Sequence, residues 1–252
     1  MKLGRFAFKN KIFFGVVKEN EVIEIDSPFL GSKPKASYLL KDLKILPPCV
    51  PSKVIAVGLN YRNHAKELGM PIPEEPIIFL KPPSAVIAHK EKIVLPPESK
   101  EVHYEGELAV VIKRPLYRPK NLKEIKDAIL GYTCFNDVTA RDLQRKDGQW
   151  TRSKSFNTFA PIGPFVETDL NPSNLRIQTK VNGEVKQDSF TSELIFDVYY
   201  LIDFVSHIMT LFPGDIIATG TPPGVGRLNP GDVVEVSIEG IGTLINEVIA
   251  YE

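Results

Sequence analysis

The chain has 252 residues, of which 43% are hydrophobic and 25% charged, so it is long enough to bury one large core and is not a disordered protein. Lys plus Arg and Asp plus Glu number 31 each, without an extended block of one sign. This balance gives no case for nucleic acid or an anionic membrane as the partner, so we expect a small-molecule ligand.

Short bursts of alternating apolar and polar residues at the start of the chain, such as IFFGVVKENEVIEI, predict a small β-meander. The proline cluster LPPCVPSK ends this pattern. We therefore expect a small N-terminal β domain over residues 1–48 and a larger domain over residues 49–252 that holds any active site.

The segment KVIAVGL predicts a strand, and NYRNHAKELG predicts a short helix with Asn60 as its N-cap and Gly69 at its C-terminal end. A spacing of three along this helix lets His64 and Glu67 meet. Such a pair is either an oriented base or an ordinary exposed helix pair. The segment 69–76, rich in Pro and Glu, is predicted to be a lid over bound substrate.

The stretch EVHYEGELAVVIKR predicts a half-buried strand in which Glu105 and Glu107, two residues apart, leave the same face. Like charges so close repel each other. The folded chain must expose them, protonate one, pair them with cations, or bind a divalent metal between them.

NLKEIKDAILGY predicts a helix that is capped by Asn121 and ends at Gly131. After it, YTCFNDVTARDLQ runs from an apolar strand into helix-like sequence. A helix that begins at this junction places Asp137, Arg141 and Gln144 on one face.

The carboxylates of Glu105, Glu107 and Asp137 come from two segments without a nearby pair of cysteines. Such a set is typical of a hard cation, Mg²⁺, Mn²⁺ or Ca²⁺, rather than zinc. The spacing is equally compatible with two glutamates on a solvated strand face and an aspartate that only caps a helix.

Further along, LRIQTKVNGEVKQ predicts a hairpin with an Asn-Gly turn, and two Pro-Gly-Asp turns each precede a strand. The most apolar segment, 193–212, is interrupted by Asp197, Asp203 and His207, which favours a core helix over a membrane span and makes His207 a core histidine. The N-terminus lacks the apolar run of a secretory signal, and Cys49 and Cys134 have no metal or redox spacing, which predicts a cytoplasmic protein.

Many short strands separated by turn residues, with few helices, predict a β-rich α+β fold, a mixed β-roll or sandwich. A plain β-sandwich that binds ligands without catalysis gives the same pattern.

Six motifs in order along the chain resemble the fumarylacetoacetate hydrolase superfamily, specifically its short members: NYRNHAKE, FLKPPSA, YEGELAVVI, FNDVTARDLQ, RSKSFNTFAPIGP and GDIIATGTPPGVG. The resemblance covers essentially residues 51–252. It implies a mixed β-roll with the active site at its open end, usually in a homodimer.

The same resemblance assigns roles to ten residues. It implies that the metal ligands are Glu105, Glu107 and Asp137, that catalysis involves His64, Glu67 and Lys154, and that Lys81, Arg141, Gln144 and Thr221 contact the substrate.

We therefore expect a Mg²⁺- or Mn²⁺-dependent hydrolase that cleaves a carbon–carbon bond in acylpyruvate-like β-diketo acids, with His64 and Glu67 activating water. The family resemblance leaves a second reading open, a tautomerase or isomerase of 2-oxo acids or an oxaloacetate decarboxylase. A third reading is a ligand-binding module without turnover.

Overall fold

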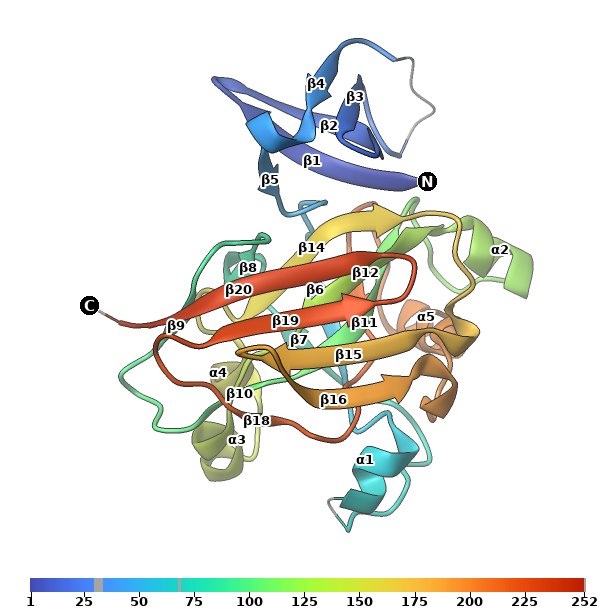
Figure 1. The fold of residues 1–252 in the computed structure, drawn as a ribbon. Coiled ribbons are helices and arrows are strands. Elements are labelled where there is room, and N and C mark those ends of the chain that lie inside the picture. The colour runs from blue at the N-terminus through green and yellow to red at the C-terminus, as the bar shows by residue number, and fades with distance from the viewer. Residues whose placement is uncertain (30–33, 68, 252) are drawn as a thin grey trace.

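The structure is a computed structural model that describes residues 1–29, 34–67 and 69–251 (Figure 1). Its strands form one sheet of twelve, one of five and one of three. The described α-helices are α1 (Arg62–Glu67), α2 (Leu122–Asp127), α3 (Arg141–Asp147), α4 (Thr151–Lys154) and α5 (Val198–Ile208). The predicted β-rich fold with few helices is confirmed.

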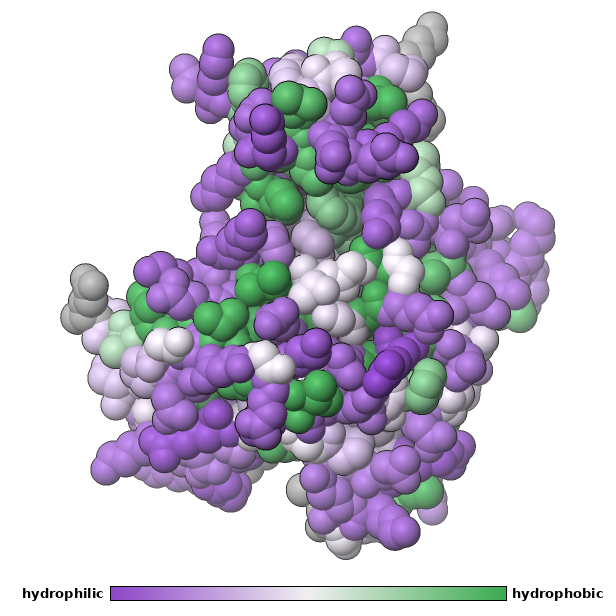
Figure 2. Space-filling view, in the orientation of Figure 1, coloured by the Kyte–Doolittle hydropathy of each residue, from purple (hydrophilic) through white to green (hydrophobic). Residues whose placement is uncertain are grey.

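The N-terminal meander stands as a separate lobe above the rest of the molecule in Figures 1 and 2. Its strands are β1 (Lys2–Phe8), β2 (Lys11–Lys18), β3 (Glu21–Ile25), β4 (Ser37–Leu39) and β5 (Lys44–Leu46). The lobe has a small core of its own, formed by Phe6, Phe13, Val22 and Leu43. It also continues the large sheet, because β1 pairs antiparallel with β14.

Beyond the lobe, the large sheet runs β14-β12-β11-β17-β6-β7, with β8 beside β14. These strands are β6 (Val54–Gly58), β7 (Ile77–Lys81), β8 (Val86–Ile87), β11 (Gly106–Ile112), β12 (Ile129–Asn136), β14 (Ala160–Glu167) and β17 (Ile216–Ala218).

The five-stranded sheet, in the order β16-β15-β19-β20-β9, packs against one face of the large sheet. Its strands are β9 (Ile93–Leu95), β15 (Arg176–Val181), β16 (Glu184–Phe190), β19 (Val233–Ile238) and β20 (Gly242–Ala250). The three-stranded sheet consists of β10 (Val102–Tyr104), β13 (Thr139–Ala140) and β18 (Gly226–Arg227).

Strand β11 lies at the centre and is buried along its whole length. Leu108 and Val110 face the core between the two large sheets, and Ala109 and Val111 face a second core on the other side. The prediction of a half-buried strand is therefore wrong: a strand covered on both faces is uniformly apolar after its polar start. The site is consequently built at the end of a rigid element.

Local turn chemistry is confirmed where the sequence indicates it. The β15–β16 hairpin turns at Asn182 and Gly183, both with positive φ, and the strands β17 and β19 follow the two Pro-Gly-Asp turns. Asn121 caps α2 as predicted, but that helix ends at Asp127, and Gly131 lies inside β12. A β-carbon on Gly131 would lie 2.3 Å from the backbone oxygen of Glu167, so the glycine permits close strand pairing instead of ending the helix.

The apolar segment 193–212 contains α5, which packs Leu201 and Val205 into the main core. Among the described residues, no helix is both long and apolar enough to cross a membrane. His207 is hydrogen bonded to the backbone oxygen of Asp203 at 2.9 Å, but its side chain is 48% exposed. The prediction of a core histidine is wrong, because position 207 lies on the outward face of the helix.

Candidate metal centre and active-site pocket

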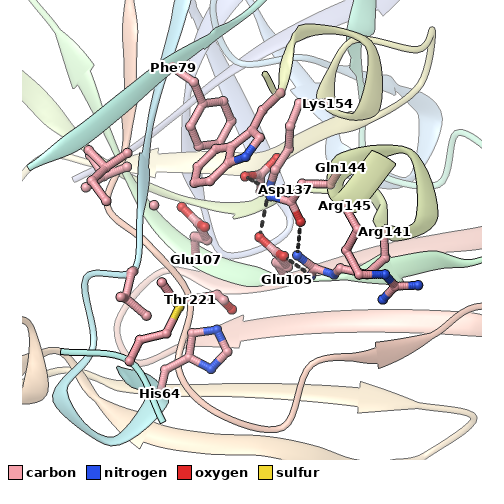
Figure 3. Close-up of a pocket in the computed structure, with 16 residues that line it drawn as sticks. His64, Phe79, Glu105, Glu107, Asp137, Arg141, Gln144, Arg145, Lys154 and Thr221 are labelled. Carbon is pink, nitrogen blue, oxygen red and sulfur yellow. Dashed lines mark hydrogen bonds and ion pairs between the residues drawn. The ribbon is translucent and has the colours of Figure 1, made fainter. Parts of the chain in front are cut away.

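Three buried carboxylates meet where β11 and β12 reach the same end of the large sheet (Figure 3). Glu105 lies in the break between β10 and β11, Glu107 in β11, and Asp137 just after β12. Each offers one oxygen atom within 4.8 Å of the others. The backbone N–H of Asp137 donates to the carbonyl of Glu105 at 2.8 Å, which fixes the two segments together. The predicted convergence of these acids is confirmed.

The route by which Asp137 reaches the site differs from the prediction. Helix α3 begins at Arg141 with Ala140 as its N-cap residue, and the two-residue strand β13 separates it from Asp137. Asp137 is therefore neither on the face of this helix nor its cap. The pairing of β11 with β12, rather than helical spacing, places it beside Glu105.

Lys154 and Arg141 neutralise one side of the cluster. The Lys154 ammonium donates to Oε2 of Glu105 at 3.0 Å and to Oδ2 of Asp137 at 2.6 Å. Nη2 of Arg141 donates to Oε1 of Glu105, and Nη1 donates to Oε1 of Gln144 at 2.5 Å. Arg141 and Gln144 are one turn apart on α3, as the sequence predicts.

Lys81 contacts the carboxylate cluster from outside the cavity. Its buried ammonium donates to Oδ1 of Asp137 at 2.5 Å and to the carbonyl of Val138 at 3.0 Å. Lys81 is not among the residues that line the cavity described below, so these contacts favour a role in holding Asp137 rather than the predicted contact with substrate. Burial and the nearby Lys154 charge, outweighing the attraction of Asp137, lower the pKa of Lys81 to about 8.

The surrounding charges shift the pKa values of Glu105 and Glu107 in opposite directions. Burial alone would raise the pKa of Glu105, but Lys154 and Arg141 outweigh it and hold that pKa well below its usual value. The pKa of Glu107 is raised well above its usual value by burial and by the charges of Asp137 and Glu105. Among the described residues no lysine or arginine forms an ion pair with Glu107, whose carboxylate accepts a hydrogen bond from the backbone N–H of Gly220 at 2.8 Å.

This arrangement fits a divalent cation. The donor atoms are all carboxylate oxygens, which Mg²⁺, Mn²⁺ and Ca²⁺ prefer. Glu107 is the member that lacks a cationic partner, and a bound ion would remove its unfavourable charge interactions. Glu105, Glu107 and Asp137 are therefore the residues that would hold the metal.

A cavity of about 300 Å³ opens in front of the carboxylates. Its polar lining residues are His64, Glu105, Glu107, Asp137, Arg141, Gln144, Arg145, Lys154 and Thr221. Eight of the ten residues to which the resemblance assigns roles, together with Arg145, thus line one cavity. Figure 3 shows His64 on the opposite side of this space from Lys154.

His64 and Glu67 form the predicted pair on α1. Nδ1 of His64 lies 2.8 Å from Oε2 of Glu67, which leaves Nε2 free of that partner. His64 is 7% exposed, whereas the Glu67 side chain is 43% exposed. The pair therefore extends from the cavity, which His64 lines, to the solvent-exposed surface. Neighbouring Asn60 does not cap the helix as predicted: its side-chain amide binds backbone groups of Phe196 and Thr219.

Thr221 reaches the cavity, but its hydroxyl is already engaged. It donates to the carbonyl of Gly106 at 2.9 Å and accepts from Nε2 of Gln187 at 2.8 Å. Gln187 in turn accepts from the backbone N–H of Gly106 at 3.0 Å. The predicted contact of the Thr221 hydroxyl proton with a substrate carboxylate would require loss of the first bond.

The sequence reasoning missed Arg145, Phe79, Trp150 and Gln187. Arg145 follows Arg141 by four residues on α3, so helical spacing alone could have indicated it. Its guanidinium binds Glu101, one contact being 3.3 Å long. Gln187 lies in β16, far away in the chain, and no local pattern indicates its contact with the site.

Comparison with known proteins agrees with these motifs. Residues 53–249 match the profile described as fumarylacetoacetate (FAA) hydrolase C-terminal, and residues 1–48 match the one described as Rv2993c-like, N-terminal. A mitochondrial oxaloacetate tautomerase of Bos taurus is 46% identical over 79% of this chain and 67% of its own length.

Two solved structures extend the comparison. The structure of a 5-carboxymethyl-2-hydroxymuconate delta-isomerase from Mycobacterium smegmatis is 46% identical, with a TM-score of 0.94 over all of both chains. A maleylpyruvate hydrolase from Sphingobium, solved with manganese(II) and pyruvate, is 29% identical, with a TM-score of 0.83 over all of both chains.

Proposed function

This chain belongs to the fumarylacetoacetate hydrolase family, and from that membership we propose that it is a tautomerase or isomerase of 2-oxo acids. The relatives described above as an isomerase and a tautomerase are each 46% identical to it, whereas the one described as a hydrolase is 29% identical. The reading as a carbon–carbon hydrolase, which the sequence motifs favoured first, is therefore the second candidate.

The observation that carries the proposal is the placement of two proton-handling groups on opposite sides of one cavity. Lys154 lies between Glu105 and Asp137, and these charges outweigh burial and raise its pKa, so the ammonium remains protonated. Across the cavity, Glu67 orients the His64 ring. Moving a proton between carbon and oxygen of a 2-oxo acid requires one group that takes a proton and one that gives it.

We assign these steps to the chain's own residues. His64 accepts the proton from the carbon next to the 2-oxo group, and Glu67 stabilises the imidazolium that forms. Lys154 and Arg141 provide positive charge at the cavity floor, where the oxygen becomes negative. A Mg²⁺ or Mn²⁺ ion bound by the three carboxylates would add a Lewis acid that offsets the same negative charge.

The second candidate has a specific observation in its favour. Nε2 of His64 is also positioned to activate water, as hydrolysis of an acylpyruvate requires. Both reactions need an enolate to be stabilised. In tautomerisation the enolate forms when the carbon loses a proton, whereas in hydrolysis water first attacks the second carbonyl and the pyruvate enolate then leaves as the carbon–carbon bond breaks.

One experiment separates the two. The enol absorbance of oxaloacetate and the NMR signals of acetylpyruvate are followed in parallel with Mg²⁺ and with EDTA. We expect metal-dependent acceleration of enol–keto conversion and little cleavage. The variant Glu105→Gln should lose the activity, while Glu247→Gln, whose partly exposed side chain pairs with Lys92, should retain it. Rapid release of acetate and pyruvate, with no effect on the enol, would reverse the order of the two candidates.

A further inference from the structure

Part of the cavity lining is apolar. It consists of Val57, Leu59, Met70, Ile77, Phe79 and Trp150, which line the same space as the charged residues. A 2-oxo acid whose head binds the charged residues would place its remaining carbon chain against this apolar lining. None of the roles assigned above uses these residues.

Phe79 and Trp150 are the aromatic members of this apolar lining, and we call them the aromatic wall. Their rings meet edge to face, with centroids 5.2 Å apart and planes at 76°. The Lys154 ammonium lies 4.8 Å from the Phe79 ring centroid, and Figure 3 shows the two side chains next to each other. The aromatic wall therefore begins directly at the group that contacts the metal-binding acids.

The start of α4 uses the backbone carbonyl of Trp150, while its ring lines the cavity. Its carbonyl accepts hydrogen bonds from Oγ of Ser153 at 2.9 Å and from the backbone N–H of Lys154 at 3.0 Å. Any residue at position 150 supplies that carbonyl. The indole is thus available to the cavity.

Gly58 makes room for the indole. A β-carbon built at this position would lie 2.6 Å from Cζ3 and 2.8 Å from Cη2 of Trp150, closer than real β-carbons come to other atoms. Position 58 is at the end of β6 without a positive φ, so its backbone suits alanine and only the ring opposes it. The absence of a side chain at position 58 therefore allows the indole to occupy its observed position beside β6.

Resting on the function proposed above, we propose that the aromatic wall is the subsite for the substrate's carbon chain and selects 2-oxo acids with an aromatic or conjugated chain. Flat unsaturated groups pack favourably on aromatic rings. The cavity volume of about 300 Å³ lies at the lower limit of the range of roughly 300–1,000 Å³ that is typical of small-molecule sites. This volume is larger than a four-carbon acid fills, so it leaves room for a longer carbon chain.

The test uses two ligands with the same head, 2-oxobutanoate and 2-oxo-4-phenylbutanoate, titrated into the protein with Mg²⁺ by calorimetry. Trp150 is the single tryptophan of the chain, so its fluorescence reports occupancy of the wall independently of turnover. We expect the phenyl ligand to bind at least tenfold more tightly and to change the emission, whereas 2-oxobutanoate leaves it nearly unchanged.

Variants locate the effect. Trp150→Ala should reduce the advantage of the phenyl ligand to about threefold or less, with little change for 2-oxobutanoate, and Trp150→Phe should retain part of it. Gly58→Ala should reduce it too, since the indole must shift. Tyr117→Ala, which removes an exposed ring that does not line the cavity, is the matched control and should behave as wild type.

Two results overturn the proposal in distinguishable ways. Equal affinity of the two ligands in the wild type, or an advantage that survives in both Trp150→Ala and Gly58→Ala, refutes the aromatic wall while leaving the 2-oxo acid function in place. Failure of both ligands to bind in the presence of Mg²⁺ refutes the wall together with the proposed function.

Discussion

Replacement of Lys154 by methionine tests the electrostatic description of the site. Methionine keeps most of the side-chain volume but removes the ammonium that bridges Glu105 and Asp137. Both carboxylates are buried, at 6% and 1% exposure, and removal of one partner of a buried ion pair costs roughly 3–5 kcal/mol when the other charge is left unpaired. Arg141 still contacts Glu105 and Lys81 still contacts Asp137, so we expect the metal-free variant to lose more than about 1 kcal/mol, with roughly 3–5 kcal/mol as the upper bound.

Mg²⁺ should reverse much of that loss. A cation that binds only the folded state stabilises it by about 2.7 kcal/mol at a concentration 100 times its dissociation constant. In Lys154→Met, Mg²⁺ would replace the positive charge that Lys154 had placed between the two carboxylates. Mg²⁺ should therefore stabilise the variant by more than it stabilises the wild type. Turnover should remain low, because the proton donor is missing.

The assay is unfolding by urea, monitored by circular dichroism, at several Mg²⁺ concentrations and with EDTA. Lys146→Met, which removes an exposed lysine of α3, is the matched control and should unfold as the wild type does in both conditions. A loss below about 1 kcal/mol in Lys154→Met without metal, typical of an exposed pair, would refute the reasoning. So would a response to Mg²⁺ that equals the wild-type response.

Further predictions concern the metal, the base and the lid. Because metal binding needs the carboxylate form of Glu107, whose pKa is raised in the metal-free protein, Mg²⁺ uptake should release a proton and weaken as pH falls; calorimetry in two buffers of different ionisation enthalpy that shows no proton release would contradict this. Glu105→Gln and Asp137→Asn should each lose Mg²⁺ affinity and activity together, so unchanged affinity in either variant would exclude it as a ligand. His64→Ala should retain Mg²⁺ binding and lose kcat by 10²-fold or more, the usual contribution of a general base, whereas a kcat within a few-fold of wild type would remove it from that role. Segment 69–76 should become resistant to protease when oxalate and Mg²⁺ are added, and unchanged cleavage would argue against a lid.

The parts of the fold that follow from local chemistry were predictable. The turn at Asn182 and Gly183, the cap at Asn121 and the Pro-Gly-Asp turns each depend on a few neighbouring residues. The end of α2 was not predictable in this way. Ile129 continues the helical pattern of apolar residues, but pairing of β12 with β11 and β14 takes it and Gly131 into the sheet.

The site shows the same division. A separation of two residues was enough to bring Glu105 and Glu107 together, although Glu105 lies in the break before β11 and not on the strand itself. A spacing of three along a helix was enough for His64 and Glu67. Contacts between segments far apart in the chain were not visible in the sequence. The hydrogen bonds that Gln187 forms with Gly106, which lies between the two glutamates, and with Thr221 arise only when the sheets pack together.

The most direct test of the account is proton exchange at carbon 3 of 2-oxobutanoate in D₂O, followed by NMR with Mg²⁺ and with EDTA. The account predicts metal-dependent exchange of the carbon-bound protons for deuterium without cleavage of the carbon chain, abolished in Glu105→Gln. Absence of exchange above the protein-free rate, for a ligand shown to bind, would contradict the assignment of an enolising active site to Glu105, Glu107, Asp137, Lys154 and His64.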